Sequence, residues 1–443
     1  MFTPGRDPAC IGFPDTSGIL LVMKTGATES FEKIPVQLMT ALRCLPDFLI
    51  FSDLDQQIGG FHLRDSLDTV LSEAKHNNPD FDLYRAQQAC AVDQHSCAKA
   101  FQAGYSYIEN DAWDLDKYKN IHMAEKAYRL RPNYDWYVFV DADTYVSWPN
   151  MVEALGRMNP AKARFLGMPT VIGPYTFAHG GSGYVLSRGA LSKFAGANPG
   201  IANKYDIDMR NHCCGDYMFA RVVKNTSNID VEGFWPLSNG EKPYTVQLGR
   251  NHWCHPVGMM HHMNSEEISS FWEFERRRYR TNKKPLLFSE VFDEFIASKI
   301  SARRDDWDNG ADEWFYLDFK AENHEWEDWR LDRAIKRDEM SDLEKVAHMS
   351  FESCKRACLH HEDCFQFMWH NDCCAMHSSM RLGQPMRKKL GEHNKMRFLS
   401  GWDMAKVRKW VAEHDCKDEI EWPEAVELYP EGSPPKDHDQ ESE

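Results

Sequence analysis

Long apolar runs, a surplus of basic charge and the glycine pattern of dinucleotide-binding loops are all missing from this sequence. No window approaches the ~18 consecutive apolar residues of a transmembrane helix, and no secretory signal peptide is recognisable. Acidic residues outnumber basic ones by 68 to 52, and the net charge of -16 argues against general nucleic-acid binding. Hydrophobic residues still make up 42% of the chain, enough to bury a sizeable core.

Cysteine, in contrast, is frequent, with 13 among 443 residues. Five of them lie between Cys354 and Cys374, and Cys416 follows. Such density is typical of a disulfide framework formed in an oxidising compartment. We therefore expect a lumenal or secreted chain whose targeting segment is absent from this sequence or has been removed. The odd number predicts at least one free thiol or an intermolecular bond, and Cys90 and Cys97 could bridge after a local bend.

Composition divides the chain into one large and one small domain, which its length allows. Dense charges and scattered tryptophans before the cysteine-rich part indicate a connecting segment at the surface. The end of the chain is acidic and has no apolar period, so we expect it to be disordered. The expected parts are an irregular lead-in (1–17), an α/β domain (18–297), the connecting segment (298–345), a cysteine-rich domain (346–416) and the disordered tail (417–443).

The first half of the chain alternates predicted strands and helices. Apolar runs at 19–24 and 47–52 predict buried strands, with an amphipathic helix between them. This strand–helix–strand unit implies two parallel neighbours. Lys24, Thr25 and Asp53 then lie where these strands end, at the sheet edge where open α/β folds bind ligands. They are candidates for contacts to a bound ligand, although such turns often only connect elements.

A second apolar run, Trp136–Val140, predicts a strand that is buried on both faces. Asp141 and Asp143 follow it at once. Carboxylates at positions i and i+2 can point to one side of the turn and hold Mg²⁺ or Mn²⁺ against a diphosphate. The same residues are equally compatible with a strand end that carries a solvated Asp turn.

Two further segments carry candidate residues. Gly180, Gly181 and Gly183 allow close backbone approach, and their spacing favours a glycine-rich bulge over a phosphate cradle. Asp216 lies near the predicted start of a helix, where a carboxylate is stabilised in its charged form. The local pattern favours a plain helix N-cap, with a general base as the alternative.

Four histidines lie close together further along the chain, at positions 252, 255, 261 and 262. A zinc site is one interpretation, but Cys/His zinc ligands usually come in two well-spaced pairs. We expect a single histidine to complete a Mn²⁺ site held by carboxylates. The other histidines are then structural.

Taken in order along residues 19–275, these segments resemble the family 31 glycosyltransferases, the β-1,3-sugar transferases that include Fringe and the core 1 galactosyltransferase. The most specific part is the aspartate strand followed by Gly-Gly-Ser-Gly-Tyr-Val-Leu-Ser at 180–187. The chain looks most like the fungal branch of the family. The cysteines at 354, 358, 364, 373 and 374, with Ser-Gly-Trp at 400–402, resemble a PAN/Apple-like domain. The resemblance implies a GT-A (Rossmann-like) domain over 18–297.

The resemblance also implies roles for single residues. Asp143 matches the metal-ligating last aspartate of the family's acidic motif, and Asp141 matches its first acid. His261 matches the family's metal-binding histidine, with His262 as the alternative. Asp216 matches the catalytic base. Two acids of the family pattern are replaced, by Ala142 in the acidic motif and by Gly215 before the base.

The implied activity is an inverting, metal-dependent transfer of a hexose from a UDP-sugar to a hydroxyl of a glycan or glycoprotein, forming a β-1,3 linkage. Lys24, Thr25, Asp53, Asp141 and Asp143 are then the expected donor contacts, with Mn²⁺ or Mg²⁺ as the cofactor. The expected place is the Golgi lumen, with a membrane-anchored full-length form. The alternatives are a catalytically silent relative that binds glycans or chaperones a partner enzyme, and an adhesive protein whose PAN-like domain is the active part.

Overall fold

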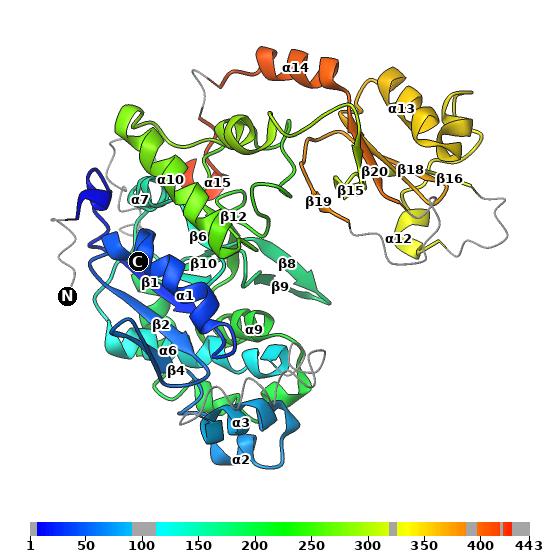
Figure 1. The fold of residues 1–443 in the computed structure, drawn as a ribbon. Coiled ribbons are helices and arrows are strands. Elements are labelled where there is room, and N and C mark those ends of the chain that lie inside the picture. Colours follow the sequence, from blue (N-terminus) through cyan, green and yellow to red (C-terminus); the bar gives the residue numbers. More distant parts are fainter. Residues whose placement is uncertain (1–6, 91–111, 319–325, 387–396, 417–419, 428–443) are drawn as a thin grey trace, which may run out of the picture. The chain divides into compact units, whose positions relative to one another are not determined.

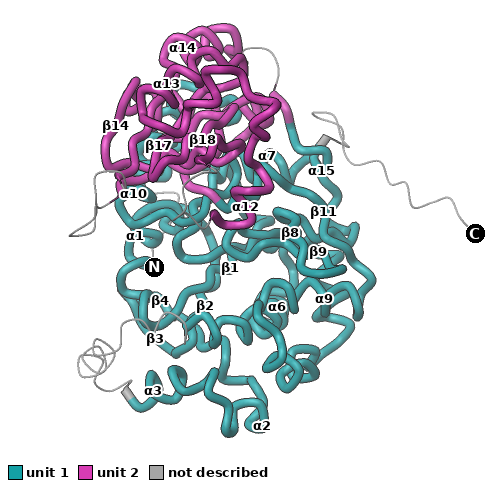
Figure 2. The backbone as a smooth tube through the Cα atoms, turned by 90° about the vertical axis from the view of Figure 1, so that its right-hand side faces the viewer, with its two compact units in different colours: residues 1–240, 257–286, 422–443 teal, residues 241–256, 287–421 magenta. Residues whose placement is uncertain are grey.

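The computed structural model describes residues 7–90, 112–318, 326–386, 397–416 and 420–427 (Figure 1). Its contacts divide the chain into two compact units (Figure 2). Unit 1 comprises 1–240, 257–286 and 422–443, and unit 2 comprises 241–256 and 287–421. The possible bridge from Cys90 to Cys97 and most of the expected acidic tail lie outside the described residues. No helix in the described part of the chain is long and apolar enough to cross a membrane.

Within the described residues, the main sheet of unit 1 has eight strands in the order β11-β7-β10-β5-β1-β2-β4-β3. Strands β5, β1, β2 and β4 are parallel neighbours, and β10 runs antiparallel between β5 and β7. The strands are β1 (Ile19–Lys24), β2 (Phe48–Ser52), β3 (Gln56–Ile58), β4 (Phe61–Asp65), β5 (Trp136–Asp141), β7 (Phe165–Gly167), β10 (Tyr184–Ser187) and β11 (Val231–Gly233). This confirms the mixed α/β class with a largely parallel sheet.

The central strands are buried on both faces, as their continuous apolar runs predicted. Val22 and Phe139 join a core that includes Ala124 of α6 and Phe219 of α9. Leu21 and Val138 point to the other face and are equally buried. In the described residues, the α-helices of unit 1 are α1 (Ser30–Met39), α2 (Ser72–Lys75), α3 (Asp82–Cys90), α6 (Lys119–Leu130), α7 (Trp148–Gly156), α8 (Arg188–Leu191), α9 (Gly215–Ser227), α10 (Ser265–Thr281) and α15 (Glu424–Glu427).

A small second sheet in unit 1 joins three distant segments. It orders β12 (Ser238–Asn239), β13 (Met259–Met260) and β6 (Tyr145–Val146). Strand β13 runs antiparallel to β6, so Met260 lies opposite Tyr145. The residue after β13 therefore lies beside the turn that leaves β5.

Unit 2 contains a five-stranded sheet in the order β14-β20-β17-β18-β16 and a two-stranded one of β15 and β19. The disulfide Cys354–Cys374 links helix α13 to the sheet, and Cys358–Cys364 links the same helix to the loop that follows the helix. A further disulfide joins Cys254 to Cys416. The elements are β14 (Arg304–Asp305), β15 (Trp307–Asp308), β16 (Trp314–Leu317), β17 (Gln366–His370), β18 (Cys373–His377), β19 (Gln384–Pro385), β20 (Leu399–Trp402), α11 (Phe288–Val291), α12 (Asp328–Leu331), α13 (Phe351–His360) and α14 (Met404–Glu413). Among the described cysteines, buried Cys373 is free.

The expected surface connector and the start of the expected disordered tail both contribute to these units. The segment 298–345 supplies β14 and β16 to the five-stranded sheet, because Phe315, Tyr316 and Leu317 form a short apolar run hidden among charges. Residues 420–427 form α15 after the buried Trp422. A short hydrophobic run therefore overrode the charged composition around it.

A buried acid behind the small sheet generates a prediction about stability. Glu275 of α10 accepts hydrogen bonds from the hydroxyls of Tyr145 (2.6 Å) and Ser147. Burial raises the pKa of Glu275 from 4.5 to about 7, against the lowering effect of these two hydroxyls. The folded chain therefore keeps a proton at this site between pH 4.5 and 7 that the unfolded chain has lost. Stability from this group is complete below pH 4.5 and falls as pH rises to 7.

We expect Glu275→Gln to remove this fall in stability between pH 4.5 and 7, which is on the order of 3 kcal/mol. Denaturant unfolding at pH 5 and pH 8 measures it, as the difference between the variant and the wild type. The variant should gain stability relative to the wild type as pH rises. Parallel pH dependences for the two proteins would contradict the assignment.

Candidate active site

The candidate site begins where β5 ends. Asp141 is the last residue of β5, and Asp143 follows in the turn to β6. Ala142 between them is buried, its N–H donates to the carbonyl of Lys24, and its carbonyl accepts from Gln37. A carboxylate at position 142 would have to be buried in this packed region, so the small residue suits the position.

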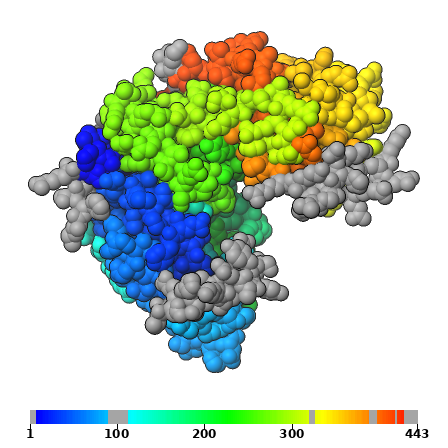
Figure 3. Space-filling view, in the orientation of Figure 1, coloured from blue at the N-terminus to red at the C-terminus, as the bar shows by residue number. Residues whose placement is uncertain are grey.

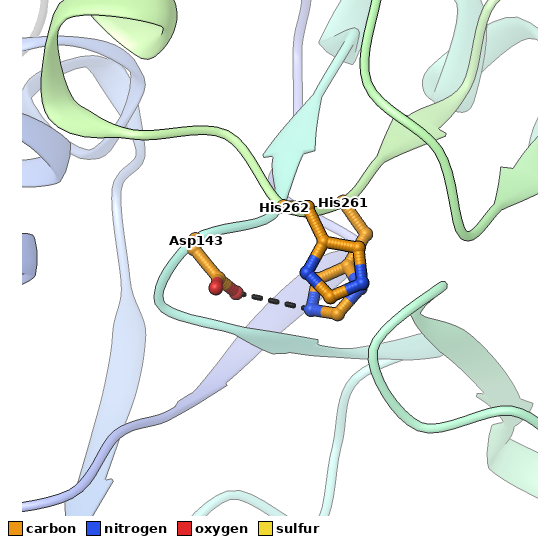
Figure 4. Close-up of side chains that lie close together, drawn as sticks. All are labelled: Asp143, His261 and His262. Atoms are coloured by element: carbon orange, nitrogen blue, oxygen red, sulfur yellow. Dashed lines mark ion pairs between the residues drawn. The ribbon is translucent and has the colours of Figure 1, made fainter. Parts of the chain in front are cut away.

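The β13 strand brings the histidine to this turn. His261 follows β13, and its Nε2 lies 3.1 Å from Asp143 Oδ1 (Figure 4). The N–H of Met263 donates to the carbonyl of Asp143 (3.0 Å) and closes the contact between the two segments. His262 has a left-handed backbone (φ 59°), and its ring lies 3.9 Å from that of His261. Both candidate histidines therefore reach the same place.

These side chains form a donor set that fits a divalent cation. Ligand atoms of Asp143, His261 and His262 all lie within 4.8 Å of one another. Imidazole with carboxylate suits Mn²⁺ and related ions. Nδ1 of His261 is buried and has no hydrogen-bond partner among the described residues. Burial opposes ionisation of Asp143, but His261 and Lys33 outweigh it and hold the pKa of this carboxyl well below its usual value.

Asp141 lies at the margin of this set. Its Oδ2 is 4.0 Å from His261 Nε2, and its Oδ1 is 3.3 Å from the ammonium of Lys24. Burial, together with nearby Asp116, raises the pKa of Asp141 in spite of Lys24. Lys24 also pairs with Asp116 at 2.5 Å, so these three residues form one charge network at the ends of β1 and β5.

The other two predicted ligand contacts are engaged within the protein. Thr25 and Asp53 are both buried. Asp53 accepts from the N–H of Ala27 (2.7 Å) and pairs with the ammonium of Lys119 (3.0 Å), which also donates to the carbonyl of Thr25. These contacts fix the turn after β1 at the sheet edge.

The glycine segment makes room for the imidazole of His261 and for the carboxylate of Asp216. A Cβ on Gly181 would lie 2.1 Å from the imidazole of His261, and one on Gly180 would lie 3.3 Å from Asp216. The N–H of Gly180 donates to Asp216 Oδ2 at 2.8 Å. The glycines predicted a close approach to the backbone. The groups that approach it are the side chains of His261, which follows β13, and of Asp216 in α9.

Asp216 lies in the first turn of α9, and both its oxygens are held by backbone donors. The second donor is the N–H of Tyr217, 2.8 Å from Oδ1. A Cβ on Gly215 would lie 2.7 Å from the carbonyl of Lys117, so a larger residue is excluded there. Cys213 and Cys214, bonded to each other, precede this turn. The carboxylate is thus positioned with lone pairs available on both oxygens.

Sequence reasoning missed four residues of this site. Lys33 of α1 pairs with Asp143 (3.1 Å), and Lys119 pairs with Asp116 (3.2 Å). Burial raises the pKa of Asp116, but Lys24 and Lys119 bring it down to about 2. The ring of His179 meets that of His261 at 6.1 Å, and burial lowers its pKa. Of these four residues, only Lys33 could have been suspected from the sequence, because it lies near the start of the helix that follows the first strand.

Comparison with protein families places this site in context. The sequence model of the Fringe-like family matches residues 67–232. This match covers Asp116, Asp141, Asp143 and Asp216, and it suggests that the chain is a glycosyltransferase. With the largely parallel sheet, it confirms the expected GT-A-like fold class, accompanied by a disulfide-rich second unit. A comparison with curated proteins found no match.

The donor set leads to a prediction about cation binding. Millimolar Mn²⁺ should raise the melting temperature of the wild type, because an ion that binds only the folded form adds roughly 2.7 kcal/mol at 100 times its Kd. Asp143→Asn should abolish this rise by removing a charged ligand. Asp135→Asn, just before the other end of β5, is the matched control and should keep it. A full Mn²⁺ effect in Asp143→Asn would rule out this site.

Proposed function

We propose that the chain is an inverting glycosyltransferase that moves a hexose from a UDP-sugar to a hydroxyl of a glycan or glycoprotein, forming a β-1,3 linkage. One observation carries the proposal. Asp143 and His261, distant in sequence, meet at 3.1 Å at one sheet edge, and the adjacent Gly180 and Gly181 lie against Asp216 and His261. The family match covers Asp143 and Asp216, while His261 lies beyond it. A carboxylate–imidazole pair and a separate carboxylate are the parts that such a reaction requires.

On the donor side, Asp143 and His261 would hold Mn²⁺ or Mg²⁺, with His262 or Asp141 as further ligands. A cation bound there supplies Lewis-acid stabilisation of the diphosphate and of the departing nucleotide. The chain contributes Lys24 and Lys33, whose pKa values are raised in spite of burial by the acids around them. Both therefore stay cationic at the sheet edge, where a polyanionic donor can pair with them once a bound cation offsets the surrounding acids.

On the acceptor side, Asp216 takes the proton from the attacking hydroxyl. The hydroxyl oxygen bonds to the anomeric carbon as the bond to the nucleotide breaks on the opposite face. One such displacement converts an α-linked donor into a β-linked product. Because the backbone N–H groups of Gly180 and Tyr217 hold the carboxylate, its orientation does not depend on the substrate.

The rival proposal is a catalytically silent relative that binds glycans. The placement of Asp143, His261 and Asp216 favours the enzyme, because each keeps the group its role needs. We further propose that residues 346–416, within unit 2, form a PAN/Apple-like module and that the protein works in the Golgi lumen. The disulfides Cys354–Cys374 and Cys358–Cys364 support an oxidising compartment.

The role of Asp216 can be tested directly. Asp216→Asn should lower transfer from a UDP-sugar about 10²-fold or more, because the amide cannot accept the proton. UDP with Mn²⁺ should still raise the melting temperature of this variant. Asp230→Asn, beyond the other end of α9, is the control and should keep full activity. An active Asp216→Asn enzyme would show that another group is the base.

The enzyme and its silent rival are separated by a simpler assay. Wild-type protein with Mn²⁺ should release UDP from one of a panel of UDP-hexoses, and chelation should stop the release. If none of the donors turns over while one of them binds, the silent relative is the better description.

A further inference from the structure

An exposed apolar hairpin precedes the glycine segment. It consists of β8 (Pro169–Ile172) and β9 (Tyr175–Ala178), joined at Gly173 with φ +57°. Val171, Ile172 and Tyr175 are 65%, 39% and 37% exposed. The hairpin reaches the molecular surface (Figure 3). Apolar side chains gathered on such an arm typically mark a binding surface.

The register sorts these side chains onto two faces. Ile172 pairs with Tyr175, and Val171 pairs with Thr176. Because successive side chains alternate, Ile172 and Tyr175 share a face with Phe177, while Val171 lies on the opposite face. One face of the hairpin thus carries an aliphatic and an aromatic side chain next to a buried aromatic ring.

That face continues to the proposed base. The ring of Tyr217 packs edge-on against Tyr175 (6.0 Å) and Phe177 (5.9 Å). The N–H of the same Tyr217 holds Asp216, and the chain leaving β9 supplies the second donor, Gly180. A chain of contacts therefore runs from Ile172 through Tyr175 and Tyr217 to the carboxylate of Asp216.

We infer that this face of the hairpin binds a polypeptide segment beside the acceptor hydroxyl and selects apolar side chains there. The inference rests on the proposed function. A sugar ring alone needs polar partners, whereas Ile172 offers only apolar contact. In the described residues, β8 and β9 pair only with each other, and β9 packs against α9, so an extended chain can add along the edge of β8. This favours a polypeptide over a lipid tail.

The test compares acceptors that share one sugar and differ in what it is attached to. The sugar is supplied as a methyl glycoside, as an octyl glycoside, and on the serine of short peptides flanked by leucine or by glycine. The wild type should prefer the leucine-flanked peptide in kcat/KM. Ile172→Ser should lower that value about tenfold, the effect expected from losing part of one aliphatic contact. Its use of the methyl glycoside should not change.

Val171→Ser on the opposite face is the matched control and should keep the preference. UDP release without acceptor should be equal in all three proteins, since it needs only the donor site. Equal use of all acceptors by the wild type, an intact preference in Ile172→Ser, or a preference for the octyl glycoside would each overturn the inference. Absence of any UDP release from the wild type would instead overturn the proposed function, and the inference with it.

Discussion

The antiparallel contact between β6 and β13 is the constraint on which the candidate site depends. It is only two residue pairs long, yet it carries His261 to the turn that holds Asp143. Tyr145 opposite Met260 fixes the register, and the hydrogen bond from Met263 to Asp143 closes the contact. A slip of one residue would turn the imidazole to the other side of the strand.

Charge balance at the sheet edge follows from the same arrangement. Asp116, Asp141 and Asp143 converge at this edge, where they are only partly exposed, and charges withdrawn from water require partners. Lys24 and Lys33 supply them in this structure. A cation at Asp143 would add to that compensation, and a diphosphate would then find positive charge on both sides. These lysines do not outnumber the acids, so a bound cation is what would make the site attractive to a diphosphate.

One continuous segment serves both halves of the proposed reaction. The β8–β9 hairpin leads into Gly180 and Gly181, which make room for Asp216 and for His261. The positions of Asp216 and His261 therefore depend on the same segment as the β8–β9 hairpin, which we infer binds the acceptor. These contacts explain why three glycines occur within four residues. A Cβ at these positions would crowd Asp216, His261 or Met259.

The sequence by itself determined the local features of this protein. Runs of apolar residues specified β1, β2 and β5, and the acids after β5 marked the sheet edge, because these signals depend only on neighbours in the chain. It did not reveal that 298–345 contributes strands, that Asp53 is engaged by Lys119, or that Lys33 and Asp116 join the site. Only the tertiary structure decided those points, and it brings both His261 and His262 to Asp143. These points depend on which distant segments pair and on which charged side chains are brought together. Such long-range contacts leave no periodic pattern in the sequence.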